Sequence, residues 1–346
     1  MSRDSSLAAS RRLPRALRAG AIGTLALLAL APGSGAAQDA GSDDSGLIGL
    51  MLPLGARTIG LGRAVAATPG ELQSLPINPA TITGLTRGGL TYSRFEPAAV
   101  AEFSGNYLAG AYVTHWGTVA AQVVLLDYGQ IVLTDDSPTP IGSVDVSEWV
   151  VGLTYANRWR DRLSYGATAK WVKTDFGVTE ASGPAFDVGA IYAPRPTLPL
   201  QLAIAVRNLG PQLEFDTTAT GTEAGEGGEA LPARVRVGVS TQPSQFFGLS
   251  PDYAVTLAFD VESDLRELSS TSQHAGAAVV VHETLVLRGG VLLLDNPADE
   301  EGDGNRQVGG ALGIGIRYGS FEADVAREVS VSELGDETHF GVGWRF

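Results

Sequence analysis

Histidine, cysteine and acidic residues are the side chains that most often catalyse reactions or bind metals. In this sequence few of them have the spacing of a catalytic or metal site. Its four histidines are His115, His274, His282 and His339, and it has no cysteine. No two histidines have the spacing of a metal site on a helical turn, and none stands beside a serine and an acid in a nucleophile motif. We therefore expect no catalytic residue, no metal ligand and no cofactor, and predict that the chain is not an enzyme.

The acidic segment "DNPADEEGDGNRQ", residues 295–307, is the nearest approach to a calcium site. The first, third, fifth and sixth positions of a calcium loop would be filled by Asp299, Glu301, Asp303 and Gly304. The twelfth position, where such loops place a bidentate glutamate, would be Gly310. We therefore interpret the segment as a solvated surface loop.

Nine charged residues occupy the polar positions of segments in which apolar and polar residues alternate. The cations are Lys170, Arg234, Arg236, Arg288 and Arg345, and the carboxylates are Glu148, Asp187, Asp260 and Asp324. If the segments enclose an interior, these charges face it, and an unpaired buried charge is costly. We expect a structural network of ion pairs. The functional alternative is an anchor for an internal segment or a site for a ligand headgroup.

The segments that must position these charges read as β-strands. From about Arg87 to the end, stretches of about ten residues alternate with period two and are separated by turn residues. For example, "YAVTLAFD" places Tyr253, Val255, Leu257 and Phe259 on one face and small or polar residues on the other. The pattern predicts about 14 antiparallel strands over residues 87–346.

The lengths of the connections favour a membrane barrel. Short connections such as 115–117 and 282–284 alternate with long polar ones such as 128–144 and 208–231. An even strand number with short turns at one end and long loops at the other is typical of bacterial outer-membrane barrels. Aromatic residues near strand ends would form the interfacial girdles: Tyr155, Trp171, Tyr192, Tyr253, Tyr318 and Trp344. The alternative is a β-sandwich or propeller, in a secreted or periplasmic protein with a binding role.

The N-terminus resembles an export signal. Arginines precede the apolar run Ala21–Ala31, which is too short to span a bilayer, and small residues follow it. We predict a signal peptide at residues 1–37 and hence location in the outer membrane. The net charge of −14 argues against a nucleic-acid partner, because phosphate binding needs a basic face.

Residues 38–86 do not alternate. They are rich in glycine and apolar residues, with proline and asparagine signals. An apolar segment ahead of a barrel must be buried, so we expect a plug in the barrel lumen, with a short helix on the rim as the alternative. At the other end of the chain, "HFGVGWRF" alternates as a strand, and we expect it to close the barrel against the first strand, near 88–95.

Several ordered stretches resemble the PorV/PorQ family of outer-membrane proteins, which are relatives of the FadL-type channels. They begin with "LGARTIGLGRAVAA" and "INPATITGL", which contains the plug motif Asn78, Pro79 and Ala80. "VVLLDYGQI", "AFDVGAIYAP", "VRNLGPQLEF", "LPARVRVGV", "LRGGVLL", "GGALGIGIRYGSFEADVA" and "HFGVGWRF" follow in order. The sequence departs from the family at Gly62–Arg63, where two glycines are usual, and lacks an acidic pair before the motif.

The resemblance implies an all-β, transmembrane barrel of about 14 strands with an N-terminal lumen plug. It implies a role in transport, or in protein secretion through cargo docking at the cell surface. The alternative is a FadL-like channel for hydrophobic small molecules. The implied partners are outer-membrane lipid, the barrel-assembly machinery, and either secretion components or a hydrophobic ligand. The machinery would read Trp344 and Phe346 as a C-terminal assembly signal.

Overall fold

The computed structural model describes most of the chain beyond its N-terminal region. The described residues are 47–97, 103–134, 140–177, 179–195, 197–216, 228–243, 253–266, 268, 271–294, 307–329 and 336–346. The predicted signal peptide and residues 295–306 of the acidic loop lie outside these ranges and stay predictions.

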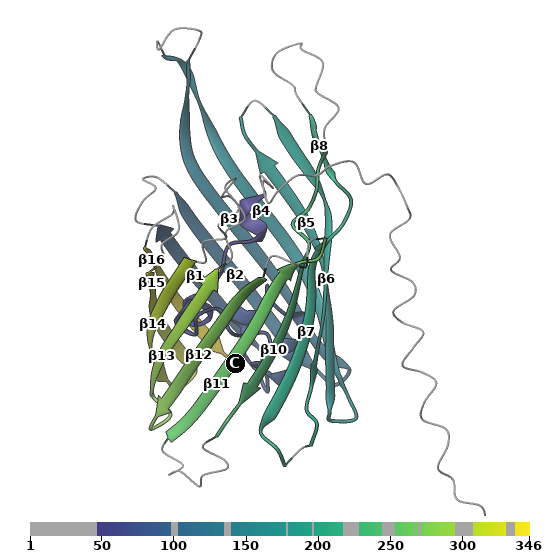
Figure 1. Ribbon diagram of the computed structural model, residues 1–346, viewed down its shortest axis with the longest axis vertical. Coiled ribbons are helices and arrows are strands. Elements are labelled where there is room, and N and C mark those ends of the chain that lie inside the picture. Colours follow the sequence, from purple (N-terminus) through teal and green to yellow (C-terminus); the bar gives the residue numbers. More distant parts are fainter. Residues whose placement is uncertain are drawn as a thin grey trace, which may run out of the picture. The chain divides into compact units, whose positions relative to one another are not determined.

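Fourteen strands of the described residues form one closed antiparallel sheet (Figure 1). They are β1 Gly89–Pro97, β2 Ser104–Thr114, β3 Gly117–Thr134, β4 Pro140–Trp159, β5 Leu163–Asp175, β6 Glu180–Tyr192, β7 Leu200–Leu209, β10 Arg234–Thr241, β11 Tyr253–Asp264, β12 Thr271–Val281, β13 Leu285–Leu294, β14 Gln307–Tyr318, β15 Phe321–Val329 and β16 Glu337–Arg345. The ring closes where β16 pairs with β1, from Arg345↔Gly89 to Glu337↔Pro97. The predicted fourteen-stranded barrel is confirmed.

Two connections differ from the predicted long loops. Strands β3 and β4 continue through much of 128–144 and are 18 and 20 residues long, well beyond the roughly 9–11 residues that cross a bilayer. A register shift between Asp127 and Gln130 interrupts the alternation there, which hides the extension in the sequence. Within 208–231, the short strands β8 (Leu213–Asp216) and β9 (Gly228–Glu229) pair with each other, and β8 also pairs with β6. The β3–β4 hairpin reaches the top of Figure 1.

The two faces of the sheet have opposite character. Strand β5 alternates without a break between exposed or half-buried residues and buried ones. Large apolar side chains cover the outer face, for example Leu312 at 73% exposure, and all six predicted girdle aromatics are exposed. The inward-facing residues are mostly small or polar, and a few large apolar side chains such as Phe95 and Tyr107 are buried among them. This is the polarity of a barrel in lipid.

The inner segment, which we define as Leu47–Leu85, lies within the ring of strands (Figure 1). It contains one short α-helix, α1 (Ala56–Gly60), and the 3-10 turns η1 (Ile48–Leu50), η2 (Leu72–Ser74) and η3 (Pro79–Gly84). Such short pieces leave many backbone groups without regular partners. No described helix is long and apolar enough to cross a membrane.

The Asn-Pro-Ala motif begins η3. The Asn78 side chain accepts a hydrogen bond from the Ala80 N–H at 3.0 Å and donates to the Ala66 carbonyl at 2.7 Å. Pro79 follows at the first turn, where its missing N–H costs nothing. A Cβ added to Gly189 on β6 would lie 2.0 Å from the Asn78 Oδ1 atom. The motif therefore needs a glycine in the facing wall.

We expect neighbouring residues of β11 to respond differently to charge. Leu257→Arg places a guanidinium on the lipid-facing side and should lower the free energy of unfolding by about 2–4 kcal/mol. Thr256→Arg is the matched control, because Thr256 lines an internal cavity. Unfolding by urea in detergent micelles, followed by the heat-modifiable gel shift of folded barrels, measures both. Equal destabilisation would mean that the assigned faces are wrong.

The chain end gives a second test. The Phe346 N–H donates to the Gly88 carbonyl at 3.0 Å, and its ring packs 5.0 Å from that of Trp344. Deleting Phe346, or Phe346→Asp, should sharply reduce assembled protein in the outer membrane, because barrel closure and the predicted assembly signal both weaken. Phe346→Tyr should assemble normally. Normal membrane levels of the deletion variant, measured by fractionation and immunoblot, would contradict the assignment.

Candidate functional site

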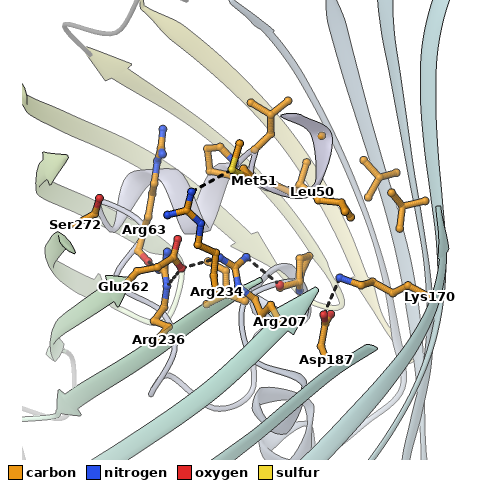
Figure 2. Close-up of a pocket in the computed structure, with 18 of the residues that line it drawn as sticks. Leu50, Met51, Arg63, Lys170, Asp187, Arg207, Arg234, Arg236, Glu262 and Ser272 are labelled. Atoms are coloured by element: carbon orange, nitrogen blue, oxygen red, sulfur yellow. Dashed lines mark hydrogen bonds and ion pairs between the residues drawn. The ribbon is translucent and has the colours of Figure 1, made fainter. Parts of the chain in front are cut away.

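A cavity of about 220 Å³ in the barrel interior, which we call the lumen pocket, lies between the inner segment and the wall (Figure 2). Residues 49–54 of the inner segment, "GLMLPL", give it one apolar side. Figure 2 shows Leu50 and Met51 on this side, with the charged residues of the wall facing them. The pocket thus has an apolar side, formed by residues 49–54, and a charged side, formed by residues of the barrel strands.

A bulge in β7 brings the first charged group together. Phe186 pairs with Leu209 but Val188 pairs with Val206, so Arg207 and Asn208 together oppose Asp187. Both residues of the bulge are buried in the interior, which strict alternation would forbid. The Asp187 carboxylate lies 2.7 Å from the Lys170 ammonium and accepts the Asn208 N–H at 2.8 Å. The buried lysine thereby gains a counter-ion.

Glu262 on β11 holds the second group. Its Oε2 atom lies 2.6 Å from both the Arg207 and the Arg236 guanidinium. Arg236 also donates to the Arg63 carbonyl at 2.7 Å and lies 3.5 Å from Asp260. The cations that line the pocket are therefore largely paired with carboxylates on the barrel strands.

Asp260 ties this group to the inner segment. One of its oxygens accepts the Val65 and Ala66 N–H groups, each at 2.9 Å. In the opposite direction, the Arg63 side chain of the inner segment contacts Glu328 on β15 at 2.5 Å. The wall thus supplies side-chain partners where the inner segment has no regular backbone ladder.

A third charged group lies around Arg57 of α1. Its guanidinium contacts Glu71 at 2.5 Å, Asp324 at 2.8 Å, and also Glu322. Arg288 lies 2.8 Å from Asp324, while Arg317 and Arg345 lie 3.2 Å and 2.9 Å from Glu322. Burial alone would raise the pKa of Glu71, but Arg57 and Arg317 lower it to about 2. Glu71 is therefore a stable anion inside the barrel.

The nine charged residues singled out in the sequence are thus distributed over several clusters. Three pairs form among them: Lys170–Asp187, Arg236–Asp260 and Arg288–Asp324. Arg345 instead contacts Glu322, and Arg234 lies 3.9 Å from Asp264 and 3.4 Å from the Met51 sulfur. Glu148 accepts hydrogen bonds from the Gly49 N–H at 3.2 Å and the Tyr128 hydroxyl at 3.3 Å.

Sequence reasoning missed the charges that connect these clusters. They are Arg57, Arg63, Glu71, Arg207, Glu262, Arg317, Glu322 and Glu328. A signal existed for some of them. Glu262 stands two residues from Asp260, and Glu322 two from Asp324, so the period of two already assigned both to the inner face. For Arg57 and Arg63, the only signal in the sequence was that they are charged residues within an otherwise apolar segment.

The histidines do not form a site with one another. His274 lines the lumen pocket, whereas the His339 ring stacks on Phe95 at 4.9 Å and lies 3.1 Å from Glu337. His115 and His282 lie in turns. Within the described ranges no group of three histidine or acidic residues could hold a metal ion.

Comparison with known proteins gives structural likeness only. No family model matches the sequence, and no curated protein matches it. The structure of CymD, a monoaromatic hydrocarbon channel, matches with a TM-score of 0.58 and 14% identity, covering 85% of this chain and 97% of CymD. The Pseudomonas putida toluene transporter TodX matches at 0.55 and 10%, covering 84% and 98%. A Pseudomonas aeruginosa FadL homologue matches at 0.50 and 11%, covering 85% and 98%. The chain has the fold of these barrels.

Arg57 should be the main link between the inner segment and the wall. Arg57→Met keeps the length of the side chain but leaves buried carboxylates with one partner fewer, and should cost about 3–5 kcal/mol of unfolding free energy. Arg94→Met is the control, because the Arg94–Glu96 pair is largely exposed and should contribute less than about 1 kcal/mol. Denaturant unfolding in micelles compares them, and similar losses would reject the role given to Arg57.

Proposed function

We propose that this chain is an outer-membrane transport barrel that passes hydrophobic small molecules, in the manner of a FadL-like channel. The observation that carries the proposal is the lumen pocket, an internal cavity of about 220 Å³ covered by Leu50, Met51 and Leu54. A docking protein would have no use for such a cavity and could fill its lumen with side chains. Apolar cover over a preformed cavity is the usual setting of a small-ligand site.

The charges that line the pocket agree with a neutral cargo. Lys170 has Asp187 as its counter-ion, and Arg207 and Arg236 share Glu262. Because these charges already compensate one another, the pocket does not require a ligand counter-ion. The likeness to CymD and TodX, named as a hydrocarbon channel and a toluene transporter, supports an apolar cargo in the same way.

The outer face supports location in the outer membrane. It carries large exposed apolar side chains and aromatic residues near the strand ends, which suit contact with outer-membrane lipid. The proposal includes export through a signal peptide at residues 1–37 and insertion by the barrel-assembly machinery. It also treats the inner segment as a plug that must shift for cargo to pass, since it lies between the lumen pocket and the short-turn end of the barrel.

Cargo docking in secretion, as in the PorV/PorQ resemblance, is the second candidate. The feature that favours it is the long β3–β4 hairpin, whose Ile131 and Val132 side chains are 51% and 57% exposed. Both lie where β3 pairs with β4 alone, past its last pair with β2 at Asp127↔Ser104. The structural comparisons lend this role no support, because the proteins they name are channels.

A cavity-filling substitution tests the transport proposal. Val124 on β3 lines the lumen pocket, so Val124→Trp should reduce uptake of toluene to the level of cells without the protein. Leu125→Trp is the matched control, because the neighbouring Leu125 faces outward at 51% exposure. Uptake of labelled toluene by expressing cells is the measurement, with the gel shift as the check on folding. Unchanged uptake in folded Val124→Trp would reject the pocket as the route and would favour the docking role.

A further inference from the structure

Glu148 on β4 is a buried carboxyl group that has no cation among its partners. Only 1% of the residue is exposed, and its Oε1 atom has no hydrogen-bond partner among the described residues. No described lysine or arginine forms an ion pair with it. Lys170, on the same face of the neighbouring strand β5, is paired with Asp187 instead. A buried carboxylate without a counter-ion is unfavourable, so this group needs a local explanation.

The Glu148 side chain joins the inner segment to strand β3. Its Oε2 atom accepts hydrogen bonds from the Gly49 N–H at 3.2 Å and from the Tyr128 hydroxyl at 3.3 Å. The Tyr128 ring stacks on Phe103 with 4.8 Å between the ring centres, which orients the hydroxyl. Glu148 therefore holds the first described residues of the inner segment against the β3–β4 hairpin.

The contact between Gly49 and Glu148 is too close for a larger residue at position 49. A Cβ added to Gly49 would lie 2.6 Å from the Glu148 Oε1 atom. The surroundings of the carboxyl group are apolar, because Leu47, Leu126 and Val150 belong to the same buried cluster and are each 3% exposed or less. When the segment is in place, water therefore cannot reach the carboxyl group to stabilise a negative charge.

Two other titratable groups among the described residues act on this carboxyl group. The Tyr128 hydroxyl donates one hydrogen bond, and Glu229 of β9 adds a charge of the same sign. The inner segment contributes the Gly49 N–H, and β5 places Thr174 opposite Glu148 in the sheet, so neither brings a charge. Burial and the charge of Glu229 both favour the neutral carboxylic acid over the carboxylate.

We infer that Glu148 is a proton-dependent latch, a contact that holds residues 47–54 of the inner segment beside the lumen pocket while its carboxyl group is neutral. Loss of the proton to water leaves an unpaired charge in an apolar site, and this cost is relieved when the segment moves away and water reaches the carboxylate. The seated form thus binds one proton more than the released form, so it is favoured at low pH and lost as the pH rises. The inference goes beyond the proposed function, because it concerns what releases the segment and not what the pocket admits.

Thiol labelling of the full chain tests the latch, because the sequence has no cysteine and one can be introduced at a chosen site. Leu50→Cys reports on the segment, since Leu50 is buried beside the lumen pocket. Thr284→Cys, in the exposed turn between β12 and β13, gives the reactivity of an accessible thiol at each pH. The measurement is the ratio of the two rates of labelling by N-ethylmaleimide, in detergent micelles from about pH 5 to about pH 9.

With Glu148 present, the ratio should rise at least about tenfold over this range, because the segment is released as the carboxyl group loses its proton. Glu148→Gln is the matched control, since the amide keeps an oxygen for the Gly49 N–H but cannot lose a proton, and its ratio should stay flat. Gly49→Ala is the positive control, because the added methyl group displaces the segment and should raise the ratio already at about pH 5. The gel shift confirms that each variant is folded.

Three results would overturn the inference: a flat ratio with Glu148 present, an equal rise in Glu148→Gln, or a low ratio for folded Gly49→Ala at about pH 5. The first two would mean that the Glu148 proton does not control the segment, and the third that the contact at Gly49 does not hold it. None of these results depends on toluene uptake, so failure of this inference and failure of the transport proposal are distinguishable.

Discussion

The need to pair every backbone N–H and C=O group in lipid is the constraint on which the rest of this structure depends. A sheet in a bilayer can have no open edge, so the last strand must return to the first, as β16 does to β1. Closure then fixes which side chains face outward and which inward along each strand. It also creates an enclosed interior, in which the inner segment lies.

The inner segment meets the same constraint by other means. It has too little regular structure to satisfy its own backbone, so wall side chains such as Asp260 accept its N–H groups, and Asn78 caps its last turn. Its arginines reach carboxylates on β15, far away in the chain. Each of these contacts joins the segment to a different part of the ring. The segment is therefore held to the barrel strands largely by side-chain contacts.

The pairing of charges differs between the two sides of the inner segment. Near the lumen pocket, cations and carboxylates of the barrel strands compensate one another, and Leu50 and Met51 form an apolar side of the pocket. Below the inner segment, carboxylates compensate only the arginines that anchor α1, and the arginines of the short turns have none among the described residues.

The sequence by itself determined the barrel, its approximate strand number, the two faces of each strand and the closing role of "HFGVGWRF". These follow from the local period of two and the order of short and long connections, which a linear pattern can carry. Only the tertiary structure decided where that period fails, as at the β7 bulge, where Arg207 and Asn208 both turn inward. It also decided which charges meet, since Arg57 and Asp324 are 267 residues apart and come together only when the ring closes around the inner segment. Pairing across an enclosed interior depends on barrel closure and packing, and no local pattern records it.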